Sequence, residues 1–101
     1  MSTNNKIEIY QQNSKLIVCD VSGLVDLVGY TPTMTVKETL NGDVVIENTG
    51  TIDNLRISHD LSYVDTSIAS KNYVYDITIE SATHRYTIVQ DELTVIDSVK
   101  Y

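Results

Sequence analysis

Side chains that could perform acid–base or nucleophilic chemistry are few and dispersed in this sequence. The 101 residues contain two histidines, His59 and His84, a single cysteine and scattered carboxylates. Hydrolysis or proton transfer needs such groups to converge on one point. We expect His84, in the turn-like stretch SATHRY, to be a solvated imidazole, and we expect the same of His59 at the end of a predicted strand. The sequence therefore predicts a protein that is not an enzyme.

Metal and cofactor sites are not indicated by the residue types either. A structural zinc site takes three or four Cys or His ligands, and only three such residues occur, far apart in the sequence. The stretches DNLRISHD and VQDE offer oxygen ligands, but their spacing matches no calcium loop. Glycine-rich phosphate loops, Gly-x-Ser-x-Gly and His-Glu-x-x-His are absent from the sequence. We therefore predict no metal and no cofactor.

Cys19 is the only cysteine, so the chain cannot form an internal disulfide. Tryptophan is absent as well, which excludes the Cys, Trp, Cys pattern of antibody domains. The flanking residues LIVCDV are mostly apolar, so we expect Cys19 to be a small buried hydrophobic residue. We accordingly predict that it resists thiol reagents in the native protein.

The charge balance argues against two classes of partner. Seven Lys and Arg face fourteen Asp and Glu, which gives a formal charge of -7. Such a chain repels phosphate backbones and anionic lipids, so we expect neither nucleic acid nor membrane partners. The N-terminal residues MSTNNKIEIY lack the pattern of a signal peptide, and no stretch approaches about 18 apolar residues. We expect a soluble protein that is made in the cytoplasm.

All seven aromatic residues are tyrosines. Most are expected to place the ring in the core and the hydroxyl at its rim. Tyr63 and Tyr101 fit no inward-facing stripe, and tyrosine is enriched at protein interfaces. These two are therefore candidate partner contacts, and the alternative is that their rings are merely exposed.

Alternating apolar and polar residues predict short strands along most of the chain. The stretch KLIVCDV is apolar on both faces, which is typical of a strand covered by a sheet on one side and by a loop or a partner on the other. The clearest strand is YVYDITIES. The residues predicted to form the core are Met34, Val36, Tyr75, Ile77, Ile79, Ile88 and Val95.

Several irregular features are also predicted. Pro32 cannot donate to a sheet, so it should lie at a strand start or on an edge strand. Asn41 and Gly42 tolerate positive φ and indicate a hairpin. Residues 60–72 could hold one helical turn with Asp60 or Asp65 as N-cap. The inward set of the last strand shifts from Tyr86 and Ile88 to Leu93 and Val95, which predicts a bulge near residues 90–92.

Six to eight short strands, frequent turn signals and the lack of a long helical period predict an all-β protein with an antiparallel sandwich. Residues 1–5 are expected to be a flexible N-terminal lead, and residues 6–101 a single domain. A chain of this length suffices for one hydrophobic core.

A succession of short motifs runs along the chain, at Gly23, Asp26, Leu27, Gly29, Tyr30, the strand from Thr33 to Lys37, Tyr73, Tyr75 and Asp76. Their order resembles the immunoglobulin-like domain at the N-terminus of phage baseplate upper proteins. The resemblance covers roughly residues 6–99, with Asn72 where the family has a glycine.

The resemblance implies an immunoglobulin-like sandwich of about seven to eight strands. It also implies that DLVGYTP crosses from one sheet to the other. In that crossing Leu27 and Tyr30 would fill the end of the sandwich, Gly29 would allow the bend and Pro32 would stiffen the exit.

For function, the resemblance implies a non-enzymatic phage virion protein, made in the host cytoplasm and docked in multiple copies on the particle. Its partners would be other virion structural proteins, and its place capsid decoration or an adaptor in a fibre, tail or baseplate. The alternative is a carbohydrate- or peptide-binding sandwich module of a cell-surface system.

Overall fold

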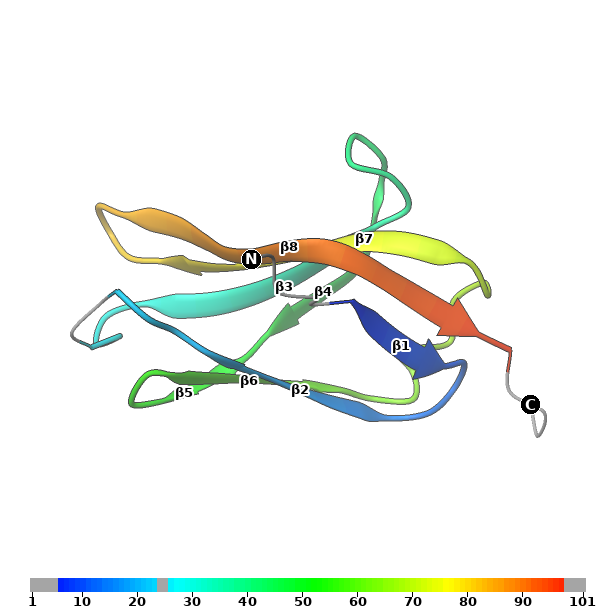
Figure 1. Cartoon of the computed structure of the whole chain (residues 1–101), viewed down its shortest axis with the longest axis horizontal. Coiled ribbons are helices and arrows are strands. Elements are labelled where there is room, and N and C mark those ends of the chain that lie inside the picture. Colours follow the sequence, from blue (N-terminus) through cyan, green and yellow to red (C-terminus); the bar gives the residue numbers. More distant parts are fainter. Residues whose placement is uncertain (1–5, 24–25, 98–101) are drawn as a thin grey trace.

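The computed structural model describes residues 6–23 and 26–97 and shows two packed β-sheets (Figure 1). No helix occurs in these two ranges, so the prediction of an all-β chain is confirmed. The predicted flexible lead, residues 1–5, lies outside the described residues. The strands are β1 (Ile7–Tyr10), β2 (Lys15–Asp20), β3 (Thr31–Lys37), β4 (Val44–Thr49), β5 (Thr51–Asp53), β6 (Arg56–Leu61), β7 (Asn72–Glu80) and β8 (Arg85–Ile96).

The larger sheet has the strand order β1-β8-β7-β3-β4, and the smaller sheet has the order β2-β6-β5. All neighbouring strands run antiparallel except β1 and β8, which pair in parallel with Ile7 opposite Leu93. The expectation of an antiparallel sandwich is therefore confirmed for every pair but this one. The exception arises because the chain crosses to the other sheet after β1 instead of forming a hairpin within one sheet.

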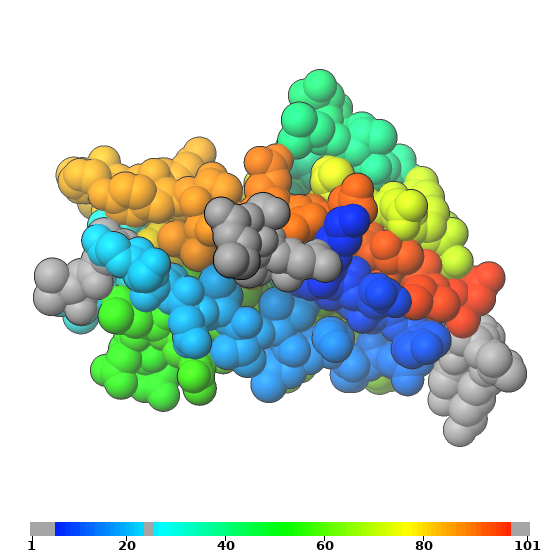
Figure 2. Space-filling model, in the orientation of Figure 1, coloured from blue at the N-terminus to red at the C-terminus, as the bar shows by residue number. Residues whose placement is uncertain are grey.

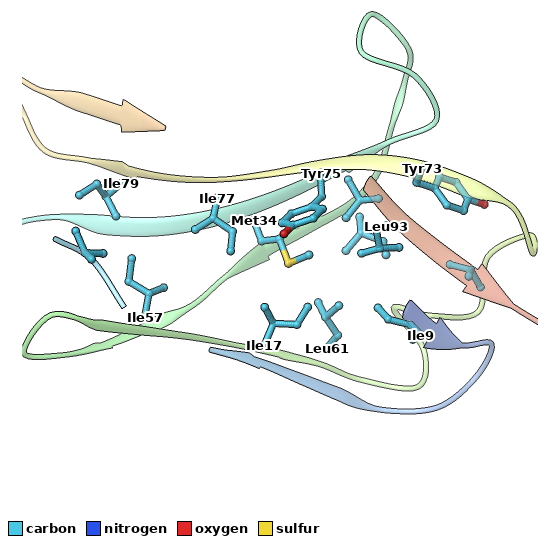
Figure 3. Close-up of a cluster of buried hydrophobic side chains, with 14 of the residues drawn as sticks. Ile9, Ile17, Met34, Ile57, Leu61, Tyr73, Tyr75, Ile77, Ile79 and Leu93 are labelled. Carbon is cyan, nitrogen blue, oxygen red and sulfur yellow. The ribbon is translucent and has the colours of Figure 1, made fainter. Parts of the chain in front are cut away.

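The core lies between the two sheets, where the inward side chains of both meet (Figure 3). Alternation along β7 buries Tyr73, Tyr75, Ile77 and Ile79, as the period-two pattern predicts. Of the seven predicted core residues, six are buried. Ile88 is only half-buried and packs against the edge of the core.

The stretch DLVGYTP carries the chain from β2 in the small sheet to β3 in the large one. Leu27 is buried in the core, and Tyr30 packs against it while donating its backbone N–H to the Leu27 carbonyl at 3.2 Å. Gly29 has φ +85°, a left-handed conformation that glycine adopts at little cost. The crossing implied by the resemblance is confirmed.

Pro32 is the second residue of β3, so the predicted position at a strand start is confirmed. The alternative, that Pro32 lies on an edge strand, is wrong because β3 lies between β7 and β4. Its carbonyl accepts a hydrogen bond from the Gly50 N–H at 3.0 Å, at the point where the chain leaves β4.

The bulge in β8 is real, but its predicted position was wrong. Ile77 pairs with Val89 and Thr78 pairs with Thr87, so the extra residue is Ile88 and pairing continues unbroken through residues 90–92. The parity of the pattern shows that one residue is inserted but does not show where. Tyr86, predicted to point inward, pairs with Ile79 at the open end of the sandwich and remains 39% exposed.

The hairpin predicted at Asn41 and Gly42 is confirmed, although neither residue has positive φ. The loop is six residues long, and the Gly42 N–H donates to the Thr39 carbonyl at 2.9 Å. The longer loop explains why no left-handed residue is required. A second hairpin, between β5 and β6, does contain a left-handed residue, since Asn54 has φ +58°.

The predicted helical turn in residues 60–72 is a single turn that does not continue as a helix. Neither Asp60 nor Asp65 caps it. Ser62 does, because its Oγ accepts the Asp65 N–H at 3.2 Å while the Asp65 carboxylate accepts the Ser62 N–H at 3.0 Å. This reciprocal pair is the capping-box arrangement, with aspartate in place of glutamate.

Candidate docking surface

Tyr63 is one of the two predicted partner contacts, and its side chain is 62% exposed. The loop beneath it is held in place, because the Tyr63 carbonyl accepts hydrogen bonds from Ser67 Oγ at 2.7 Å and Thr66 Oγ1 at 3.3 Å. The ring therefore projects from a braced turn. The other predicted contact, Tyr101, lies outside the described residues.

The turn that carries Tyr63 is joined to the turn between β1 and β2. Thr66 Oγ1 donates to the Asn13 carbonyl at 2.9 Å, and the Gln12 N–H donates to the Thr66 carbonyl at 3.3 Å. Gln11 Nε2 donates to the Ile68 carbonyl at 2.8 Å. These bonds place the two turns side by side at one end of the sandwich.

Strand β2 exposes apolar side chains beside this end. It is one of the two edge strands of its sheet, and among the described strands it pairs only with β6. Its inward residues are Ile17, which is buried, and Cys19, which is half-buried, whereas Leu16 is 59% and Val18 48% exposed. Isolated exposed apolar residues are ordinary, but two on the same face of a regular edge strand form a surface that proteins usually protect.

Leu16, Val18, Tyr63 and Val64 together make up what we call the β2-end surface. Leu16 pairs with Asp60 of β6, and the chain leaves β6 at Leu61 to reach Tyr63 and Val64 directly. All four side chains are exposed. The expected cover of the inner face of β2 by a sheet is confirmed, whereas among the described residues no loop covers its outer face, so a covering partner stays a prediction.

A hollow of about 340 Å³ opens along the unpaired edge of β2, toward β8. Its walls include Lys6, Ile17, Cys19, Tyr75 and Val89. Burial, reinforced by the charge of Asp20, raises the pKa of the Cys19 thiol. Burial, with the charges of Asp91 and Cys19, raises the pKa of Tyr75 to about 12. Both groups are therefore protonated at neutral pH, so the hollow offers no activated nucleophile, and its charged lining residues are Lys6 and Asp20.

His59 is a buried residue, so the expectation of a solvated imidazole was wrong. It is 0% exposed and points into the core from β6, with Nδ1 2.9 Å from Asn48 Oδ1 on β4. Asn48 donates its amide Nδ2 to the Asp60 carbonyl, which leaves Oδ1 as an acceptor and places the imidazole proton on Nδ1. Nε2 then carries a lone pair and has no hydrogen-bond partner among the described residues.

The signal for His59 was present in the sequence. Ile57 and Leu61 alternate with outward residues, and the same period places His59 on the inward face. His84 is exposed as predicted, in the β7–β8 turn, with Nδ1 2.7 Å from Thr83 Oγ1. The two imidazoles thus occupy a sealed core position and a surface turn, and the structure does not bring them together.

The outer face of the larger sheet is polar and regular. Thr49, Thr33, Thr78 and Thr87 are successive pairing partners, so they form one row across β4, β3, β7 and β8. A shallow hollow of about 410 Å³ covers part of this face. Burial raises the pKa of Asp76 in the next row, and the nearby Lys37 opposes that shift.

Within residues 6–23 and 26–97, no three His, Cys, Asp or Glu side chains gather in a way that could hold a metal ion. The oxygen-rich stretches 53–60 and 89–92 are therefore not drawn together into one site there. The described segments also include no helix long and apolar enough to cross a membrane.

Comparison with known proteins adds information on the fold. No family model and no curated protein matches the chain. Among solved structures, the immunoglobulin-like domain of mouse leukocyte-associated immunoglobulin-like receptor 1, crystallised as a strand-swapped dimer, is similar with a TM-score of 0.50. The two chains are 16% identical, and the match covers 95% of this chain and 93% of the receptor domain. The chain has an immunoglobulin-like β-sandwich fold.

Proposed function

We propose that this protein is a non-enzymatic structural component of a phage virion, docked in multiple copies through the β2-end surface. The observation that carries the proposal is the exposed outer face of β2. Leu16 and Val18 lie on a regular edge strand whose outer backbone groups are not paired within the described residues. A neighbouring protein can cover such side chains and extend such an edge by backbone pairing.

The arrangement of reactive groups supports a binding role over a catalytic one. His59 is sealed in the core and its Nε2 meets no donor, while His84 lies on a distant surface turn. The raised pKa of Cys19 keeps the thiol protonated at neutral pH. General acid–base or nucleophilic catalysis needs such groups beside one another and in contact with a substrate.

Purified phage particles provide the test. Mass spectrometry should find the protein in intact particles at a constant copy number. Replacing Leu16 and Val18 together by serine, or Tyr63 by alanine, should lower that copy number several-fold while the free energy of unfolding changes little, because these side chains are already exposed.

Leu40 and Val44 are equally exposed and lie around the β3–β4 loop, so their double serine variant is the matched control. This control should be incorporated normally. Particles that lack the protein would contradict the virion proposal. Normal incorporation of the Leu16, Val18 variant would contradict only the assigned surface.

A carbohydrate- or peptide-binding module is the second candidate, favoured by the threonine row on the larger sheet. Hydroxyls at fixed spacing beside Asp76 and Glu47 present donors and acceptors to a polar ligand, above a shallow hollow. Thr33→Val and Asp76→Asn should abolish glycan binding in a microarray if this module is correct. The β2 variant should leave such binding intact.

A further inference from the structure

We propose that two copies of this chain exchange strand β1, each copy placing its β1 on the β8 of the other. The occupant of the β1 position is then a second copy of the same chain. This inference goes beyond the proposed virion role, because it follows from the turn after β1 and does not require any other protein.

The turn that connects β1 to β2 is strained. The Asn13 N–H donates to the Tyr10 carbonyl at 3.1 Å, which closes a four-residue turn, and Gln12 within it has φ +61°. That place in a turn is normally taken by glycine, since the left-handed region is costly for residues with a Cβ. A short hinge held under strain favours domain swapping, because opening the hinge releases the strain.

Exchange of β1 between two copies breaks few contacts. The pairing of β1 with residues 93–96 of β8, the bond from the Gln11 N–H to the Ile96 carbonyl and the bond from Gln11 Nε2 to the Ile68 carbonyl all form again on the second copy. The hydrogen bonds that belong to the closed turn are Asn13 N–H to Tyr10, Gln12 N–H to Thr66, Asn13 Nδ2 to Gln11 and Thr66 Oγ1 to Asn13. Gln12 and Asn13 are exposed, so water can replace the bonds that they make. The Thr66 hydroxyl is buried and keeps the Tyr63 carbonyl as an acceptor.

The position that β1 leaves cannot remain empty. Ile9 is 2% exposed and lies close to Leu61 and Leu93 in the core (Figure 3). Ile7 packs against the same core, and β1 lies beside the C-terminal part of β8 on the surface (Figure 2). Removing β1 would open this end of the core to water, so an opened copy needs another β1 there. Reciprocal exchange satisfies both copies with the same contacts, as a two-fold symmetric dimer requires.

Pairwise cross-linking tests the exchange directly. Glu8 of β1 is opposite Thr94 of β8, and both lie on the outer face of the sheet. One preparation carries Cys19→Ser and Glu8→Cys, and the other carries Cys19→Ser and Thr94→Cys. The two are unfolded, refolded together at high concentration and oxidised. A disulfide between the two preparations requires β1 of one copy to lie on β8 of the other.

We expect a non-reducing gel to show the disulfide-linked dimer of the two preparations. Sedimentation should give twice the mass of one chain, both for the oxidised mixture and for the wild-type protein. A Gln90→Cys preparation replaces the Thr94→Cys one as control, because β1 reaches only residues 93–96, and it should give no such dimer. A monomer in sedimentation with no mixed disulfide would overturn the proposal. Virion incorporation of a strictly monomeric chain would overturn the exchange alone and leave the proposed function standing.

Variants of the hinge between β1 and β2 should shift the equilibrium between monomer and exchanged dimer in opposite directions. Gln12→Gly relieves the left-handed strain in the closed hinge and so stabilises the monomer. Because each dimer forms from two closed monomers, the dimer association constant should fall about fivefold for each of the two hinges. Ser14→Gly adds a glycine to the same hinge at a residue with ordinary φ and is the matched control. Gln12→Pro, whose ring fixes φ near about −65°, cannot form the closed turn and should be almost entirely dimeric. Equal dimer fractions in all three variants would contradict the role of the hinge.

Discussion

At the scale of single residues, His59 is the most unusual feature of the molecule. A neutral imidazole with one hydrogen-bonded nitrogen lies in the core between the sheets, where most of the buried side chains are hydrophobic. Burial lowers the pKa of His59, and the hydrogen bond to Asn48 only partly opposes that shift. The protonated ring would present an N–H at Nε2 to surroundings that contain no acceptor for it.

The lowered pKa makes stability depend on pH in a defined direction. In the unfolded chain His59 binds a proton with the ordinary histidine pKa near 6.5, whereas in the native state its pKa is lower. The contribution of His59 is therefore complete above that pH, and stability declines as the pH falls below it toward the native pKa. Urea denaturation at a series of pH values should show this decline, and His59→Leu should remove it. His84→Gln should leave it in place, and a His84-dependent decline would contradict the assignment.

Cys19 gives a second prediction at this scale. Its thiol is half-buried beside the hollow along β2, and burial raises its pKa, so the thiolate fraction at neutral pH is small. A thiol reagent should label native Cys19 much more slowly than the urea-unfolded chain. The rate should rise with pH above the ordinary thiol range. Equal rates in the native and unfolded states would show that the side chain is freely accessible.

At the scale of elements, the passage from β4 to β5 depends on Gly50. A Cβ built on Gly50 would lie 2.5 Å from the Ser58 carbonyl oxygen and 2.8 Å from the His59 ring. Since the chain changes sheets here, neither neighbour can retreat without disturbing the pairing of β5 with β6. Gly50→Ala should lower the free energy of unfolding by about 1–3 kcal/mol. The exposed neighbour variant Thr49→Ala should change it by less than about 0.5 kcal/mol in the same denaturation experiment.

The sequence allowed the long strands to be predicted, because their alternation is uninterrupted, as β7 shows. It did not allow β5 to be separated from the turns around it, since three residues carry too little periodicity. The parallel pairing of β1 with β8 depends on contacts between distant segments, which local patterns do not encode. The bulge position is ambiguous for a related reason, because parity fixes the number of inserted residues and not their place.

The candidate site was predictable only in part. Tyr63 stood out because it fits no inward stripe, and it is exposed in the structure. The apolar run of β2 predicted that a loop or a partner covers its outer face, and in the structure Leu16 and Val18 on that face are exposed. The strained turn at Gln12 gave no signal, because glutamine does not mark left-handed geometry.

At the scale of the whole molecule, the negative charge opposes compaction. Fourteen acidic residues outnumber seven basic ones. Ion pairs between described residues, such as Lys6 with Glu92 and Arg85 with Glu80, lie at the surface, where each contributes little. Net repulsion should therefore dominate the response to salt. The free energy of unfolding should rise between about 10 mM and about 500 mM NaCl. A fall over this range would show that the ion pairs outweigh the repulsion.

The pairing of β1 with β8 also has a consequence during synthesis. Of the described strands, β1 leaves the ribosome before the others, yet its partner among them is β8, whose pairing residues 93–96 are translated after the other described strands. β8 is also one of the two strands that pair with β7, so the pairing of β7 is complete only after β8 has been made. At about 5–20 residues per second, β1 waits several seconds for its partner. In the proposed exchange, the nascent chain on the preceding ribosome of the same messenger can offer a finished β8 first, so the spacing of ribosomes becomes a factor in which copy each β1 joins.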